Sequence, residues 1–146
     1  MRIAITSGYF DPLHRGHLEL FRLARARGDA LWVIVNSDAQ ARLKKGAPFL
    51  DQETRLALVA ALRDVDRAVL AVDADGSVRL TLAGLVAEAR AQGHDPVFCK
   101  GGDRHAGNIP EADVLREHDV PLIDGLGAKV DSSSRITARP RSDGQA

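Results

Sequence analysis

Short apolar runs alternate along the chain with longer segments whose apolar residues recur at helical spacing. The runs at residues 2–7, 30–36, 67–72, 96–99 and 120–123 predict five strands. The second run, ALWVIVN, is almost wholly apolar, which is typical of a strand buried on both faces of a parallel sheet. The intervening segments predict helices over residues 16–27, from a cap at Asp51 to about residue 63, and over residues 76–92, 111–117 and 132–138.

This strand and helix alternation predicts an α/β fold. We expect a Rossmann-like, doubly wound parallel sheet of five strands in a single domain over residues 1–138, followed by a polar tail at 139–146 that we expect to be disordered. In such sheets ligands bind beyond the carboxyl ends of the strands, where the strand order reverses. Polar segments follow the first, second, fourth and fifth predicted strands, so they are expected to surround one crevice.

Composition narrows the range of partners. The 146 residues carry 20 Lys and Arg against 20 Asp and Glu, and this zero formal charge argues against nucleic acid and an anionic membrane as partners. The only cysteine, Cys99, excludes an internal disulfide and a thiolate zinc site, and with Trp32 it is expected in the core. The first apolar segment is too short for a signal peptide or a membrane span, so we expect a cytoplasmic protein with a small-molecule partner.

The segment TSGYFDPLHRGH, which follows the first predicted strand, carries the chemistry. Gly8 leaves room for a phosphate near the backbone, and His14 and His17 are spaced to share the first turn of a helix. A helix N-terminus presents unpaired N–H groups and a partial positive charge, and two imidazoles add donors beside it. This combination suits a phosphate chain, although neither GxxxxGK[ST] nor GxGxxG occurs.

The residues GYFDPLHRGH resemble the GxFDxxHxGH signature of the cytidylyltransferase-like nucleotidyltransferase superfamily. The segments VNSD, KKG, the predicted helix with Arg55, KGGD and SSSRI follow in that family's order, so the resemblance covers about residues 3–136. It implies transfer of a nucleoside monophosphate from CTP or ATP to a phosphorylated sugar or polyol, with release of pyrophosphate. It also implies a homodimer and Mg²⁺ bound through the nucleotide phosphates rather than by a protein metal cage.

The resemblance assigns a role to each matching residue. The catalytic set is His14, His17, Lys44 and Arg55. Those expected to bind the nucleotide are Thr6, Gly8, Tyr9, Phe10, Asp11, Lys100, Gly101, Asp103, Ser132, Ser133 and Ser134. The acceptor is expected to contact Asp38, Lys45 and Arg104. The lysines are expected to act from a mobile loop after the second strand.

Several residues also have structural interpretations. Arg55 can instead form an ion pair with Asp51 or with a carboxylate of a neighbouring strand, and Asp11 either holds the first loop or faces Mg²⁺. Asp38 and Asp103 are also turn formers, and the three serines also suit a helix cap.

The sequence leaves the nucleobase open, as well as which of Lys44 and Lys45 meets the phosphates. SSSRI departs from the SSTxI or STTxI form of relatives but keeps the hydroxyl. A catalytically silent nucleotide-binding module and a flavodoxin-like signalling domain are the alternative functions.

Overall fold

Five parallel strands form one sheet in the computed structural model, which describes residues 1–101 and 109–127. The strands are β1 (Arg2–Gly8), β2 (Ala30–Val35), β3 (Arg67–Leu70), β4 (Asp95–Gly101) and β5 (Leu122–Leu126). Their order is β3-β2-β1-β4-β5, and every neighbouring pair is parallel. The order reverses between β1 and β4, which confirms the predicted doubly wound α/β fold and places its switch point.

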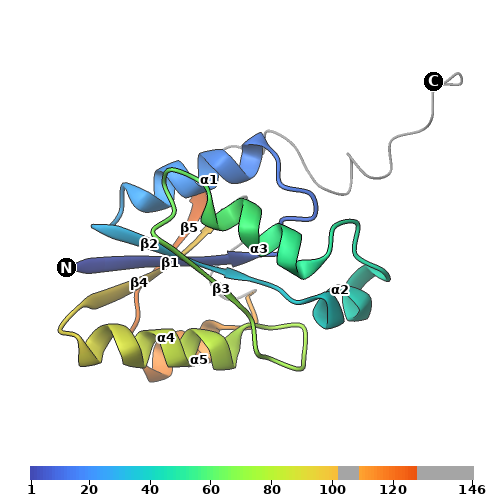
Figure 1. Ribbon diagram of the computed structural model, residues 1–146. Coiled ribbons are helices and arrows are strands. Elements are labelled where there is room, and N and C mark those ends of the chain that lie inside the picture. Colours follow the sequence, from blue (N-terminus) through green and yellow to red (C-terminus); the bar gives the residue numbers. More distant parts are fainter. Residues whose placement is uncertain (102–108, 128–146) are drawn as a thin grey trace, which may run out of the picture.

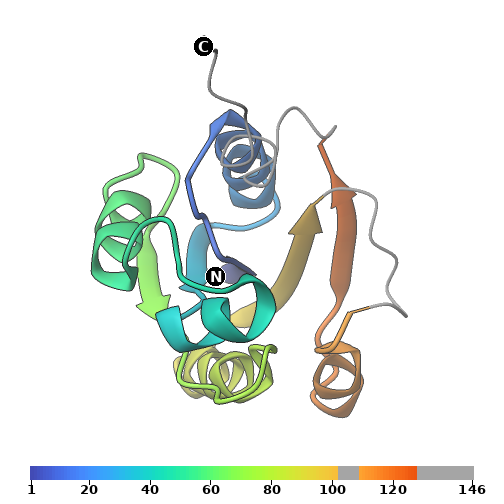
Figure 2. The same ribbon diagram turned by 90° about the vertical axis from the view of Figure 1, so that its right-hand side faces the viewer.

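Helices cover both faces of the sheet (Figure 1). On one face lie α1 (Arg15–Arg25) and α3 (Gln52–Ala60), and on the other lie α4 (Arg79–Ala91) and α5 (Ala112–Glu117). A further helix, α2 (Asp38–Lys45), stands in front of the carboxyl ends of the strands (Figure 2). Among the helices of the described ranges, none is both long and apolar enough to cross a membrane.

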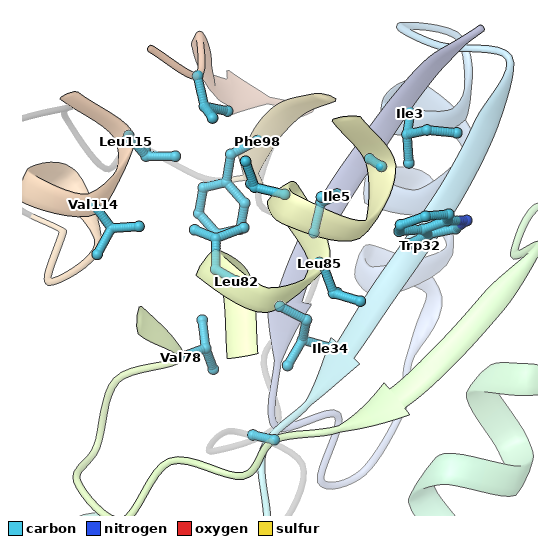
Figure 3. Close-up of a cluster of buried hydrophobic side chains, with 14 of the residues drawn as sticks. Ile3, Ile5, Trp32, Ile34, Val78, Leu82, Leu85, Phe98, Val114 and Leu115 are labelled. Carbon is cyan, nitrogen blue, oxygen red and sulfur yellow. The ribbon is translucent and has the colours of Figure 1, made fainter. Parts of the chain in front are cut away.

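The two faces of the sheet bury separate clusters of side chains because successive strand residues point to opposite sides. Ile3, Ile5 and Ile34 pack with Leu82 of α4 and Leu115 of α5 (Figure 3). The alternate residues, such as Ala4, Leu31 and Val33, pack with Phe21 of α1 and Val59 of α3. Trp32 lies in the first cluster and Cys99 in the second, which confirms their predicted place in the core.

The structure moves some predicted boundaries. The fifth strand is Leu122–Leu126 rather than residues 120–123, since Leu122 pairs with Phe98 and Leu126 with Gly101. The helix expected from residue 76 begins at Arg79. The side chain of Asp73, which precedes the helix, accepts the N–H groups of Leu80 and Thr81 and so satisfies donors of the first turn. The helix expected at 132–138 and the tail at 139–146 lie outside the described residues.

The segment after β2 is a helix and not the predicted mobile loop. Ser37 accepts the N–H of Gln40 at 3.2 Å, and Gln40 Oε1 accepts the N–H of Ser37 at 2.9 Å, which is a reciprocal capping box. Lys44 and Lys45 therefore occupy the last turn of α2, where cations suit the negative end of the helix dipole.

Candidate active site

A cavity of about 680 Å³ opens at the carboxyl ends of β1, β2 and β4. It is within the size range of small-molecule sites. Side chains and backbone of several elements meet there: Ser7, Gly8, Tyr9, His17, Asn36, Gln40, Leu43, Lys44, Lys45, Gly76, Val78, Lys100, Pro110 and Glu111. The switch point between β1 and β4 lies at this end of the sheet, as the sequence predicts for the binding site.

His14 and His17 meet at the N-terminus of α1. Their rings are stacked, with 3.8 Å between centroids. The Nδ1 atom of His14 accepts the backbone N–H of Gly16 at 3.0 Å, and Nδ1 of His17 accepts the N–H of His14 at 3.2 Å. Because a backbone N–H can only donate, both Nδ1 atoms are acceptors and each neutral ring carries its proton on Nε2.

Burial keeps His17 neutral. Burial, with a smaller contribution from the neighbouring His14, lowers the pKa of His17 to about 3. His17 lines the cavity, and its Nε2–H has no hydrogen-bond acceptor among the described residues. The ring is therefore a neutral donor available to an anionic ligand.

Gly8 is required by Phe10. A Cβ on Gly8 would lie 2.8 Å from Cζ of the Phe10 ring, closer than real contacts allow. Phe10 is buried and has a positive φ of 54°, and its ring meets His17 edge-on at 5.0 Å between centroids. The room expected for a phosphate beside Gly8 is thus partly taken by Phe10, which holds His17 in place.

Asp11 connects the loop after β1 to the segment before α3. Its carboxylate is fully buried and accepts the N–H groups of Phe49 at 2.9 Å and Leu50 at 2.7 Å. Lys45 Nζ lies 3.4 Å from the same carboxylate. These contacts favour the loop-holding interpretation of Asp11, because both of its oxygens are already engaged.

Lys44 lies at the cavity wall above an aromatic ring. Its Nζ is 4.7 Å from the centroid of Tyr9, which also lines the cavity, and this cation–π contact orients the ammonium group. Lys45 is turned toward Asp11 instead. Of the two lysines, Lys44 is the better placed to meet phosphates.

Arg55 lies behind the cavity wall. Its side chain is fully buried, with Nε donating to Leu50 O and Nη1 donating to the carbonyls of Tyr9 and Asn36 at 2.7–2.9 Å. Nη2 pairs with Asp38 Oδ1 at 2.7 Å. Four of its five N–H groups are engaged, and this environment favours the ion-pair alternative over direct phosphate contact. The carboxylate is that of Asp38, just after β2, and not that of Asp51.

Thr6 and Gly101 are also structural in this conformation. The Thr6 hydroxyl donates to the carbonyl of Cys99 at 2.7 Å, just past the point where the β1–β4 pairing ends at Ile5 and Phe98. Thr6 therefore satisfies a buried carbonyl where the two strands separate. A Cβ at Gly101 would lie 3.2 Å from Leu20 Cδ1, so this glycine lets α1 pack closely on β4.

Some predicted site residues fall outside the described part of the chain: Asp103, Arg104, Ser132, Ser133 and Ser134. Sequence analysis also missed several residues that line the cavity, namely Gln40, Gly76, Val78 and Glu111, and it gave no individual role to Asn36 of the VNSD segment. Gln40 had a detectable signal, the Ser37 to Gln40 capping spacing. Glu111 had none, because only the fold brings residue 111 beside the ends of β1 and β2.

No group of three or more His, Cys, Asp or Glu side chains within residues 1–101 and 109–127 is arranged to hold a metal ion. The donor set of the cavity is instead cationic and N–H rich, with His17, Lys44 and Lys100 on its walls. Such a donor set suits phosphate groups.

The parallel sheet, the histidine pair at its switch point and the cavity define a Rossmann-like nucleotide-binding enzyme. Comparison with known proteins gives the family: a model described as cytidylyltransferase-like matches residues 5–139. The chain belongs to this family of nucleotidyltransferases.

Named relatives and solved structures agree with this assignment. The chain is 38% identical over 144 residues to the bifunctional protein HldE of Streptomyces coelicolor, covering 94% of this chain and 28% of that protein. It is 31% identical over 140 residues to the FAD synthase of Thermoplasma acidophilum, covering 96% of this chain and 83% of the relative.

A lipopolysaccharide core biosynthesis protein from Thermoplasma volcanium superposes with a TM-score of 0.63 at 26% identity, covering 85% of this chain and 95% of that structure. The chain thus spans less than a third of the relative HldE and most of the relative FAD synthase.

Proposed function

We propose that the chain transfers a nucleoside monophosphate from ATP or CTP to the phosphate of a small phosphorylated sugar or polyol and releases pyrophosphate. The observation that carries this proposal is the stacked histidine pair, whose Nδ1 atoms are both held by backbone N–H groups at the N-terminus of α1. His17 of this pair lines a cavity that also carries Lys44 and Lys100.

The reaction requires no protein nucleophile. An oxygen of the acceptor phosphate attacks the α-phosphorus in line, and a new P–O bond forms. The bond from the α-phosphorus to the oxygen that bridges it to the β-phosphorus breaks, and its electron pair leaves with pyrophosphate. The protein aligns the two phosphates and places donors where negative charge grows, which are the roles of the Nε2–H of His17 and of Lys44.

ATP is the nucleotide that we favour. The relative named FAD synthase makes a product that contains an adenylyl group, and this chain covers 83% of that relative's length. Mg²⁺ would be held by the nucleotide phosphates, because Asp11 is occupied by backbone donors. A homodimer and a cytoplasmic location, without nucleic-acid partners, complete the proposal.

Arg55 and Asp38 enter this proposal as positioning residues. Their ion pair connects the start of α2 to α3, and Arg55 also holds the carbonyls of Tyr9 and Asn36 at the ends of β1 and β2. Lys45 joins α2 to Asp11 in the same way. Lys44 therefore reaches the cavity from a helix that is fixed at both ends.

Pyrophosphate release tests the proposal. The purified protein with Mg²⁺ is supplied with ATP or CTP together with glycerol 3-phosphate, a heptose 1-phosphate or FMN. We expect turnover with one nucleotide and at least one acceptor. His17→Ala should lower kcat by about a hundredfold or more while changing the nucleotide Kd by less than about fivefold, because the donor acts mainly in the transition state.

His118→Ala is the matched control, since His118 is a half-buried histidine outside this cavity. It should leave kcat unchanged. Turnover of His17→Ala near that of the wild type would remove the histidine from the mechanism. A wild-type protein that binds nucleotide but releases no pyrophosphate with any pair would be the silent nucleotide-binding module.

A further inference from the structure

Two buried oxygens on the cavity walls have no donor from the protein in the described ranges. The first belongs to Asn36, which is 4% exposed. The Nε2 of Gln40 donates to the carbonyls of Asp75 and Ser77, each at 2.7 Å, so Gln40 Oε1 must be the acceptor on its other side. It accepts the amide Nδ2 of Asn36 at 3.0 Å. This chain of donors fixes the orientation of the Asn36 amide and leaves Oδ1 as the atom without a partner.

The second oxygen belongs to Glu111, which lies just before α5 and is also 4% exposed. Its Oε2 accepts the backbone N–H of Val78 at 3.0 Å, and Val78 has no side-chain cap of its own at the start of α4. Within residues 1–101 and 109–127 no group donates to Oε1 of Glu111 or forms an ion pair with it.

In each of these two side chains only one of the two polar atoms has a structural role. Asn36 Nδ2 serves the Gln40 network, and Glu111 Oε2 serves the start of α4. A buried polar atom without a partner destabilises a fold unless water or a ligand reaches it, so native proteins contain few of them. Both residues line the cavity, where a ligand can supply the missing donors.

We propose that Asn36 and Glu111 form a recognition site for a neutral hydrogen-bond donor, a hydroxyl or amino group, on one of the two reactants. This inference rests on the proposed function and names the part of the cavity that selects the substrate. A carboxylate repels phosphate, so Glu111 faces a part of the ligand that carries no negative charge. In the proposed function the phosphates are held instead by His17, Lys44 and Lys100, which line the same cavity.

Specificity follows from the chemistry of this pair. Two acceptors reject a ligand that lacks the donor, because the buried oxygens then stay unpaired after water has left the cavity. The donor can come from the nucleobase or ribose of the nucleotide, or from a hydroxyl of the sugar or polyol acceptor. The experiment below separates these two sources.

Glu111→Gln is the decisive variant. Its amide oxygen can still accept the Val78 N–H, so the melting temperature should stay within about 2 °C of the wild type, while an amide NH₂ replaces the acceptor in the cavity. We expect the affinity for one reactant to fall by about tenfold to a hundredfold. Calorimetry with ATP and CTP tests the nucleotide, and the KM for the acceptor in the pyrophosphate assay tests the other reactant.

Glu117→Gln is the matched control, because Glu117 is an exposed acid at the end of α5, the helix that Glu111 precedes, and lies outside this cavity. This substitution should change neither the affinity for the nucleotide nor the KM for the acceptor. If nucleotide binding is weakened in Glu111→Gln, 2′-deoxy-ATP and purine riboside triphosphate identify the donor. The analogue that lacks the recognised donor should bind the wild type weakly, and its affinity should not fall further in Glu111→Gln.

Folded Glu111→Gln whose nucleotide Kd and acceptor KM both stay within twofold of the wild type overturns the inference. If Glu111→Gln does not fold, the wild type alone decides. The inference is overturned if ATP and both analogues bind the wild type equally and the acceptors of the pyrophosphate assay have equal KM values. A wild type without transferase activity refutes the proposed function instead. In that case the nucleotide Kd of Glu111→Gln, compared with that of the wild type, still tests the recognition site.

Discussion

His17 presents a neutral imidazole with a fixed orientation to the cavity. His17 keeps its Nδ1 on a backbone N–H, so its Nε2–H is aimed without any need for a carboxylate partner. Burial and the neighbouring, stacked His14 ring both disfavour protonation of His17 to its cationic form. His17 therefore presents a directed donor from a neutral ring to the cavity, whose wall also carries the ammonium group of Lys44.

This state of His17 predicts an unusual titration. Because burial lowers its pKa to about 3, the Cε1–H resonance of His17 should not move between pH 8 and pH 5, whereas an exposed histidine titrates near pH 6.5. Proton NMR of the ligand-free protein measures this, with His17→Asn to assign the signal. A midpoint near 6.5 would show that the ring is solvated and would contradict the buried-donor geometry.

At the scale of elements, α2 shows what the sequence could and could not predict. Residues 38–45 carry no apolar stripe, so periodicity indicated a loop. The helix forms because Ser37 and Gln40 cap each other and because Gln40 holds the carbonyls of Asp75 and Ser77. The capping spacing was visible in the sequence, but the partners 35 and 37 residues away were not. Lys44 lies at the cavity wall, but on a helix and not on the predicted loop.

Arg55 joins four elements and should matter for stability first. It holds the ends of β1 and β2, Asp38 of α2 and the segment before α3. Arg55→Met should lower the free energy of unfolding by about 3–5 kcal/mol, because it leaves the half-buried Asp38 carboxylate and three carbonyls unpaired. The nucleotide Kd of the folded protein should change by less than about threefold. Urea denaturation and calorimetry measure the two quantities.

Arg63→Met is the control for that substitution, since Arg63 is exposed and follows α3. It should change stability by less than about 0.5 kcal/mol. A stable Arg55→Met protein that binds ATP poorly would instead return Arg55 to the direct phosphate contact that the sequence alone suggested.

At the scale of the whole molecule, the sequence predicted the fold class because strand runs and helical stripes are local signals. The doubly wound sheet follows from alternation alone. The cavity walls do not, because Asn36, Val78 and Glu111 are brought together only by the strand order β3-β2-β1-β4-β5 and by α4 and α5 lying on one face. Asn36 belongs to the VNSD segment that the sequence analysis noted, whereas Val78 and Glu111 belong to no motif and were missed.

Acid stability connects the site to the whole fold. The folded pKa of His17, about 3, lies below the unfolded value of about 6.5, so below pH 6.5 the unfolded chain binds a proton that the folded protein does not. His17 contributes its full stability above pH 6.5 and loses it progressively as the pH falls toward 3. Between pH 8 and pH 5 this loss amounts to about 2 kcal/mol.

Exposed carboxylates such as Glu88 and Asp113 have pKa values lowered by Arg67 and Arg79, respectively, so their contributions change only at lower pH. Urea unfolding of the wild type and of His17→Asn at pH 8, 6.5 and 5 measures the contribution of His17 to the free energy of unfolding. The wild type should lose about 2 kcal/mol more than the variant over this range. Parallel losses in both proteins would mean that His17 is not buried as a neutral ring, and the orientation of its Nε2–H toward a phosphate would lose its physical basis.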